Sequence, residues 1–227
     1  MPDGMEKLAG LSAKKRALLE AMLKEKGIDL SERYILPAAR SGNTMPLSFA
    51  QQRLWFLDQL EPGSPSYNIP LALRLTGRLD EAALEKSLKW IAVRHESMRT
   101  TFALLDDQPV QVIHPQLRID IPRENLRHLS EGEKEEAVLR KINEEAKRPF
   151  DLTQGPLFRA RLLLLGDEEV VALFTMHHII SDGWSMGVLV RELVQCYPAF
   201  LHGEDPGLPE LKIQYADFAE WQRTRLQ

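Results

Sequence analysis

The sequence predicts an α/β fold of the α+β sandwich type, in which helices cover a mixed or antiparallel sheet. An apolar run rich in β-branched residues, Val170–Met176, follows Gly166-Asp167 and an earlier apolar run, Leu157–Leu165, and this pattern is typical of a buried β-hairpin. Stretches with helical spacing lie before this hairpin, at 49–60, 80–94 and 130–147, and after it, at 184–197. The chain therefore combines strand and helix patterns within the length of a single domain, which is the basis for predicting one α/β domain.

The individual elements follow from start and stop signals. Residues 11–25 predict a helix with Ser12 as N-cap and Gly27 just beyond its end, and 37–46 predict a polar linker. In chain order we then expect helix 49–60, strand 69–76, a helix capped by Asp80 and ending near Arg94, strands 98–105 and 110–114 around an Asp106-Asp107 turn, helix 130–147, the hairpin, and helices over 184–197 and 215–221. This divides the chain into an N-terminal helix and linker, 1–44, and a lobe, 45–227.

Composition excludes several classes of protein. The 227 residues are 44% hydrophobic and 27% charged, with a net charge of -4 and no Lys/Arg block, so nucleic-acid binding is not expected. No apolar run could span a bilayer, and residues 1–7 lack the apolar core of a signal peptide. The single cysteine, Cys196, cannot form an internal disulfide, which favours a cytoplasmic location. The basic face of helix 11–25 fits either a solvated arm or a docking element for an acidic partner.

The feature that points to chemistry is the pattern H-H-x-x-x-D-G, formed by His177, His178, Asp182 and Gly183 at the end of the second hairpin strand. Successive strand residues point to opposite faces, so one histidine should face packed protein and the other a cleft. An imidazole titrates near neutral pH and suits a general base. The Asp182 carboxylate is expected to hold the following loop by an ion pair, and Gly183 allows close approach of backbone to a substrate.

Two other interpretations stay open from these residues alone. The pair could be hydrogen-bonded residues at a strand end with no chemical role. It could also bind zinc, since His and Asp are common ligands. Neighbouring strand residues diverge, however, and the remaining histidines, His95, His114, His128 and His202, are scattered, so no metal is predicted.

Four ordered segments carry a family resemblance. They are Leu47-Ser48-Phe49-Ala50-Gln51-Gln52-Arg53-Leu54-Trp55-Phe56-Leu57, Arg94-His95-Glu96-Ser97-Met98-Arg99-Thr100-Thr101-Phe102, Met176-His177-His178-Ile179-Ile180-Ser181-Asp182-Gly183-Trp184-Ser185 and Tyr215-Ala216-Asp217-Phe218-Ala219-Glu220-Trp221. Together they closely resemble the successive motifs of condensation domains of nonribosomal peptide synthetases. The likeness covers residues 45 to 222 and includes Arg148-Pro149-Phe150-Asp151-Leu152.

The resemblance implies a chloramphenicol acetyltransferase-like fold of two lobes with a tunnel between them. The present chain looks like the N-terminal lobe alone, so we expect weak or no activity from it unless the C-terminal lobe is added or the chain pairs with itself. Substrates would arrive as thioesters on the phosphopantetheine arms of upstream and downstream peptidyl carrier proteins, and no cofactor would be bound directly. The implied reaction is amide formation, by the subtype that joins two L-configured residues.

The resemblance also assigns residue roles. His178 is implied to be catalytic, His177 and Asp182 to hold the motif in shape, and Gly183 to line the reaction centre. Substrate, tunnel or structural support is expected from Arg53, Trp55, Arg99, Trp184 and Ser185. Two alternatives remain: a non-catalytic module that docks carrier proteins, and a related acyltransferase that uses a soluble thioester.

Overall fold

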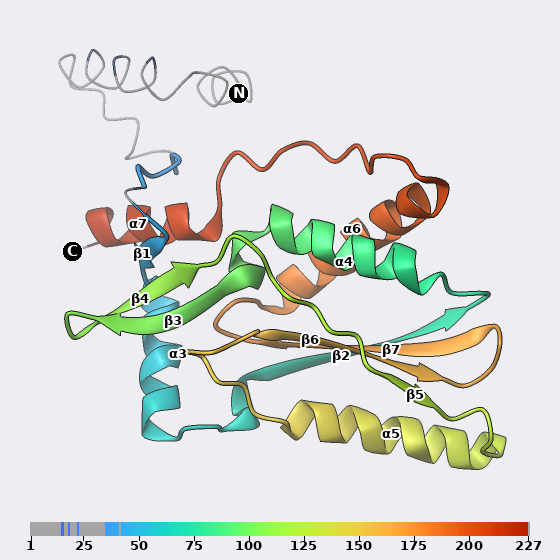
Figure 1. Ribbon diagram of the computed structural model, residues 1–227. Helices are drawn as coiled ribbons and strands as arrows, with labels where there is room; N and C mark the ends of the chain where they lie inside the picture. Colours follow the sequence, from blue (N-terminus) through green and yellow to red (C-terminus); the bar gives the residue numbers. More distant parts are fainter. Residues whose placement is uncertain (1–14, 16–17, 19–21, 23–34, 41, 227) are drawn as a thin grey trace.

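A computed structural model describes residues 15, 18, 22, 35–40 and 42–226 (Figure 1). The predicted helix 11–25 and most of segment 1–44 lie outside the described residues. The strands form two sheets, a division that the sequence did not predict. The strands are β1 (Thr44–Pro46), β2 (Asn68–Thr76), β3 (Thr100–Leu105), β4 (Gln108–Ile113), β5 (Arg123–Asn125), β6 (Phe158–Leu164) and β7 (Glu169–His177). The helices are α3 (Phe49–Leu60), α4 (Glu81–Arg94), α5 (Glu131–Lys147), α6 (Gly183–His202) and α7 (Tyr215–Arg225), with 3-10 turns η2 (Pro65–Tyr67) and η3 (Glu96–Arg99).

The larger sheet has the strand order β2-β7-β6-β5. The predicted hairpin forms β6 and β7, and β2 pairs antiparallel with β7 from Asn68 opposite His177 to Thr76 opposite Glu169. The short β5, which the sequence did not reveal, pairs parallel with β6, so the sheet is mixed. Residues 170–177 of β7 are all buried, as expected of a central strand covered on both faces.

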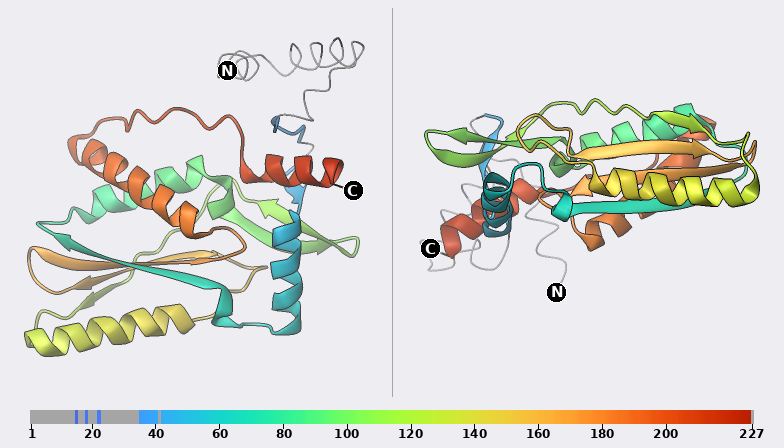
Figure 2. Two further views of the ribbon diagram at one scale, coloured as in Figure 1. Left: turned by 180° about the vertical axis from the view of Figure 1, so that it is seen from behind. Right: turned by 90° about the horizontal axis from the view of Figure 1, so that it is seen from below.

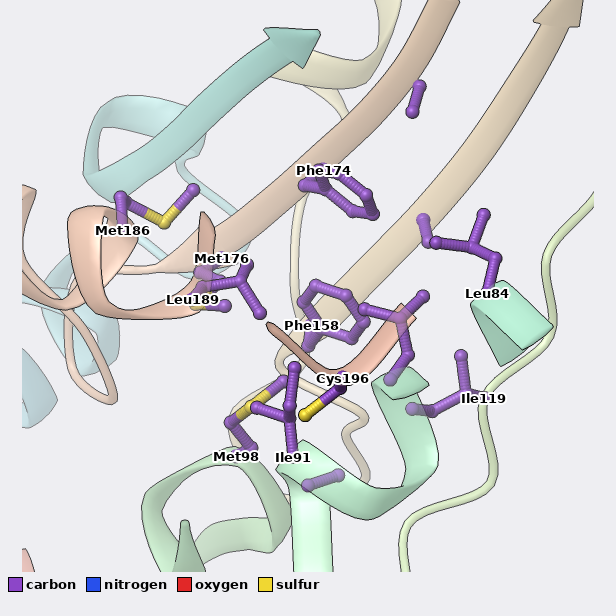
Figure 3. Packing of buried hydrophobic residues seen from close by; sticks show 14 of the residues in the cluster. Leu84, Ile91, Met98, Ile119, Phe158, Phe174, Met176, Met186, Leu189 and Cys196 are labelled. Carbon is purple, nitrogen blue, oxygen red and sulfur yellow. The ribbon is translucent and has the colours of Figure 1, made fainter. Parts of the chain in front are cut away.

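Helices cover both faces of this sheet. Helices α4 and α6 lie on one face and α5 on the other (Figures 1 and 2). Figure 3 shows the first interface, where Phe158 and Phe174 of the sheet meet Leu84 and Ile91 of α4 and residues of α6. On the opposite face, α5 contributes Ala137 and Val138 to a smaller cluster. The α/β lobe with a mixed sheet covered by helices is therefore confirmed.

The smaller sheet has the order β1-β4-β3. Asp106 and Asp107, in the turn between β3 and β4, have φ of 49° and 60°, the left-handed conformation that a tight two-residue hairpin turn requires. Thr44–Pro46 pair with β4, so the prediction of a continuous linker over 37–46 is wrong at its end. Residues 44–46 extend because β4 offers them a free edge, which local polarity could not reveal.

Most predicted boundaries are confirmed. Helices α3, α4 and α5 begin and end within a residue of prediction, and their starts follow the N-cap residues Ser48, Asp80 and Ser130. The strand expected from Met98 begins instead at Thr100, after η3. Among the described residues, no helix is long and apolar enough to cross a membrane.

Candidate active site

His177 is the last residue of β7 and His178 is the first residue beyond it, and the two side chains enter different environments, as the alternation of strand side chains predicts. The backbone N–H of His177 donates to Leu157 O (3.0 Å), and that of His178 donates to Tyr67 O (2.8 Å). His177 is only 3% exposed, whereas His178 is exposed and lines a pocket. The prediction that one histidine faces packed protein and its neighbour a cleft is confirmed.

His177 is a packed, neutral residue. Its ring meets Phe150 edge-on at 6.1 Å between centroids and Tyr67 at 6.3 Å. Its Nδ1 accepts the N–H of Ile179 at 3.1 Å, which fixes the start of the following turn. Burial, and secondarily the neighbouring His178, lowers the pKa of His177 from 6.5 to about 4. His177 therefore shapes the turn and remains unprotonated near neutral pH.

His178 is held with one ring nitrogen available. Its Nδ1 lies 2.8 Å from Ser181 O. A carbonyl oxygen only accepts hydrogen bonds, so Nδ1 carries the proton when the ring is neutral. Nε2 then bears the lone pair. The contact orients the ring and leaves Nε2 able to accept a proton from a bound nucleophile.

Asp182 begins α6 as its N-cap. Its Oδ1 accepts from the backbone N–H and hydroxyl of Ser185, at 2.8 and 2.6 Å. These hydrogen bonds, chiefly the one from the Ser185 hydroxyl, lower the pKa of Asp182 below its usual value. No cation lies within ion-pairing distance of Asp182 in the described part of the chain, so the expected ion pair is wrong there. A helix N-terminus, with its unpaired N–H groups, stabilises the carboxylate instead.

The next two residues of the motif face open space. A Cβ built on Gly183 meets no atom within 4 Å, so packing among the described residues does not demand a glycine there. Trp184 is 80% exposed. Both positions are therefore free to contact something outside this lobe.

A pocket of about 550 Å³ adjoins His178. It lies between α3, the start of α6 and the segment that leads into α7. Its lining includes Gln51, Leu54, His95, Ser97, His178, Ile179, Ile180, Ser181, Asp182, Ser185, Val188, Arg191, Glu192, Leu211, Ile213, Gln214 and Tyr215. The histidine motif thus opens onto a space large enough for a small-molecule group.

Gln51 is a site residue that the sequence interpretation overlooked. It is 2% exposed, and its Nε2 lies 3.3 Å from Ile179 O and 3.1 Å from Gln111 Oε1. Its Oε1 accepts the N–H of Ser48 at 3.0 Å. This one amide ties α3 and β4 to the residue that follows His178. Only one feature of the sequence indicated its role: Gln51 lies in the first of the four motif segments, where Arg53 and Trp55 were the residues expected to support the site.

Replacing Gln51 by leucine is expected to lower the free energy of unfolding by about 2–4 kcal/mol, because each buried polar partner left unpaired costs about 1–3 kcal/mol. Denaturant titration of the chain 1–227 measures this. Gln59, exposed on the same helix, supplies the control: Gln59→Leu should change stability by less than about 0.5 kcal/mol. Equal losses for both variants would contradict the role of Gln51.

The other residues predicted to support the site, Arg53, Trp55 and Arg99, occupy different kinds of position in the structure. Arg53 is exposed and does not line the pocket. Trp55 is 6% exposed and packs against Phe102, with 6.4 Å between ring centroids, in the cluster that also buries Ile179 and Ile180. Arg99 donates to His114 O and Val93 O, which ties the end of α4 to β4. Trp55 and Arg99 thus support the structure around the site, and any tunnel role for Arg53 stays a prediction.

Arg94 and His95, at the end of α4, share a partner on a helix that is distant in sequence. Glu192 of α6 lies 3.1 Å from Arg94 Nε and 2.8 Å from His95 Nε2. The side chains of Glu192 and Arg94 are 8% and 10% exposed. This buried cluster joins α4 to α6 at the wall of the pocket. No group of three or more His, Cys, Asp and Glu side chains suited to hold a metal occurs among the described residues.

The neutral state of His177 predicts a stability that depends on pH. Below pH 6.5 the unfolded chain takes up a proton that folded His177 does not bind until about pH 4, so the free energy of unfolding falls as pH decreases between these values. At about 1.4 kcal/mol per pKa unit, the loss is on the order of 3 kcal/mol. His177→Asn should remove this part of the pH dependence in denaturant titrations at pH 7.5, 6, 5 and 4. The exposed control His178→Asn should retain it, and an unchanged profile in His177→Asn would show that His177 is not the group responsible.

A condensation domain family model matches residues 41–227, and the chain belongs to the condensation domain family. The sequence is 55% identical over 201 residues to a component protein of linear gramicidin synthase from Brevibacillus parabrevis, covering 88% of this chain and 3% of that protein. It is 42% identical over 226 residues to phosphinothricin tripeptide synthetase PhsC from Streptomyces viridochromogenes, covering 100% of this chain and 21% of that protein. The chain therefore spans a small part of these relatives.

Solved structures agree in fold. The starter condensation domain of rhizomide synthetase RzmA matches with a TM-score of 0.73 at 26% identity, over 81% of this chain and 44% of that chain. A mutant of that domain is described in complex with C8-CoA and Leu-SNAC, with a TM-score of 0.72 at 25% identity, over 80% of this chain and 41% of that chain. The X-domain in its complex with OxyB from teicoplanin biosynthesis matches with a TM-score of 0.74 at 33% identity, over 85% of this chain and 40% of that chain. The chloramphenicol acetyltransferase-like lobe is thereby confirmed.

Proposed function

We propose that this chain supplies the histidine-bearing lobe of a peptide-bond-forming condensation domain in a nonribosomal peptide synthetase. The donor is an acyl or peptidyl thioester on one carrier protein, and the acceptor is an aminoacyl thioester on another. The observation that carries the proposal is the geometry of His178, whose Nδ1 is engaged by Ser181 O and whose ring is exposed at a pocket. A cytoplasmic location stays a prediction.

The reaction needs one proton acceptor. The acceptor amine attacks the donor carbonyl carbon and forms the C–N bond as its proton passes to His178 Nε2. The C–S bond then breaks, and the departing thiolate takes up that proton, which regenerates neutral imidazole. No oxidant, metal or bound cofactor is needed for this balance.

Positioning should supply more of the rate than proton transfer. General base catalysis is worth about 10²- to 10⁴-fold. Fixing two reactants in attack geometry is worth about 7–11 kcal/mol, which is a far larger factor. A thioester is already activated, so a modest base combined with an enclosing tunnel is sufficient. We therefore expect a second lobe, or self-association through the face that carries Trp184, to be required for efficient condensation.

The finer proposal is the subtype that joins two L-configured residues. Its support is the segment Met176-His177-His178-Ile179-Ile180-Ser181-Asp182-Gly183-Trp184-Ser185, in which the first motif position is histidine and not the aspartate typical of cyclising domains. Peptidyl donors ending in an L-residue should react faster than the same donors ending in a D-residue. Chiral analysis of the peptide hydrolysed from the acceptor carrier distinguishes the two donors, and preference for the D-donor would overturn the subtype.

A non-catalytic docking module is the second candidate. It is favoured by the match to the X-domain, whose structure is described as a complex with another protein, OxyB. The two candidates differ in what His178 does. A docking module would bind carrier proteins equally well with His178→Ala and would release no amide.

The test compares the chain 1–227 with a completed chain, in which residues 1–227 are followed by the remainder of the condensation domain of the matched gramicidin synthase protein. Each protein is mixed with one carrier loaded with a donor thioester and another loaded with an aminoacyl thioester, and mass spectrometry follows amide on the acceptor carrier. The completed chain should form amide, and the chain 1–227 should form little. Carrier binding without amide formation by either protein would favour the docking module.

A further inference from the structure

The pocket at His178 extends well beyond the imidazole. It follows α6 from the N-cap, Asp182, to Glu192, which at 1.5 Å per residue is a length of about 15 Å. Apolar side chains form much of its wall: Leu54 from α3, Val188 from α6, and Ile213 from the segment before α7. A substrate carbonyl held beside His178 would leave most of this space for a group attached to the reacting carbon.

The buried charge at the far end is already neutralised. Glu192 pairs with Arg94 and His95. Beside it, the Gln214 amide accepts from Glu96 N at 3.1 Å and donates to Arg94 O at 3.0 Å. A charged ligand group reaching this end would find no free buried counter-charge among the residues that line the pocket, and burial of an unpaired charge is costly.

We propose that this pocket is a side-chain subsite that selects an aminoacyl group with a bulky apolar side chain. The inference rests on the proposed function, because it takes the reacting carbon to lie at His178. Apolar walls stabilise an apolar side chain in proportion to the area removed from water. The donor residue and the acceptor residue share this chemistry, and the amine of the ligand distinguishes them, since only the acceptor has a free one.

The subsite predicts a graded preference. One methylene in a hydrophobic pocket discriminates about 10- to 200-fold. A leucyl ligand should therefore bind at least about tenfold more tightly than a glycyl ligand. An aspartyl ligand should bind no more tightly than the glycyl one, although Arg191 is exposed at the rim.

The experiment measures dissociation constants of the chain 1–227 by calorimetry for N-acetylcysteamine thioesters of leucine, glycine and aspartate. Each is supplied with a free amine, as an acceptor mimic, and with a formylated amine, as a donor mimic. Val188→Phe should fill the pocket and abolish most of the leucine preference, and Val188→Ala should reduce it. Val194→Phe, on the same helix at a position 71% exposed and outside the pocket, should leave it unchanged.

The outcomes separate this inference from the proposed function. A leucine preference confined to the free-amine series assigns the subsite to the acceptor, and one confined to the formylated series assigns it to the donor. Equal binding of leucyl and glycyl ligands, or tighter aspartyl binding, overturns the subsite even if the completed chain forms amide through His178. A preference that depends on Val188 in the chain 1–227, together with no amide formation by the completed chain, retains the subsite and overturns the condensing function. Because Val188→Ala only removes methyl groups, it decides the matter if Val188→Phe does not fold.

Discussion

Replacing His178 by alanine is expected to slow amide formation by the completed chain about 10²- to 10⁴-fold, the usual contribution of a positioned general base. The reason is local: Ser181 O holds Nδ1, and Nε2 is the nitrogen left to take the proton of the acceptor amine. Single-turnover transfer between two loaded carrier proteins measures the chemical step, and binding of the carriers should change little.

His202 provides the matched control. It is also exposed, and its Nδ1 contacts a backbone carbonyl, Pro198 O, at 2.7 Å, but it lies at the far end of α6. His202→Ala should therefore leave the transfer rate unchanged. A His178→Ala protein as fast as the wild type would remove the imidazole from the mechanism.

Removing the Glu192 carboxylate has the largest expected effect on stability. Glu192→Ala leaves Arg94 and His95 without the acceptor that joins them to α6, and losing one partner of a buried ion pair costs about 3–5 kcal/mol. Denaturant titration at pH 7.5 reports this loss. The same change widens the end of the proposed subsite, so the leucine preference should weaken in parallel.

Two comparisons isolate the buried charge as the cause. Glu85 pairs with Lys89 on the exposed side of α4, so Glu85→Ala should cost less than about 1 kcal/mol. The double variant Arg94→Leu with Glu192→Leu removes both charges and should be more stable than Glu192→Ala, because no buried guanidinium is left unpaired. Equal losses in Glu85→Ala and Glu192→Ala would show that the buried pair is not special.

Local sequence patterns were sufficient to predict a helix or strand wherever that element is determined by its own residues. The side chains of Ser48 and Asp80 accept hydrogen bonds from N–H groups three residues further on, and Ser130 pairs with Glu133 three residues further on, so the starts of α3, α4 and α5 could be predicted. Local patterns were insufficient to predict an element that forms only by pairing with a distant segment. Strand β1 depends on β4, and β5 depends on β6. Neither short segment has a strong strand pattern of its own, so neither strand could be predicted.

The site divides in the same way. The two-residue period of a strand determined that His177 and His178 face opposite environments, and the chain order of four motifs pointed to the family. Only the tertiary structure decided which ring nitrogen of His178 is free, that Asp182 caps α6 where an ion pair was expected, and that Gln51 and Glu192 border the pocket. The physical reason is the separation in sequence of the residues that interact. Periodicity and capping act over a few residues, whereas Gln51 contacts Ile179 and Glu192 contacts Arg94 across segments that are brought together only by burial of apolar surface.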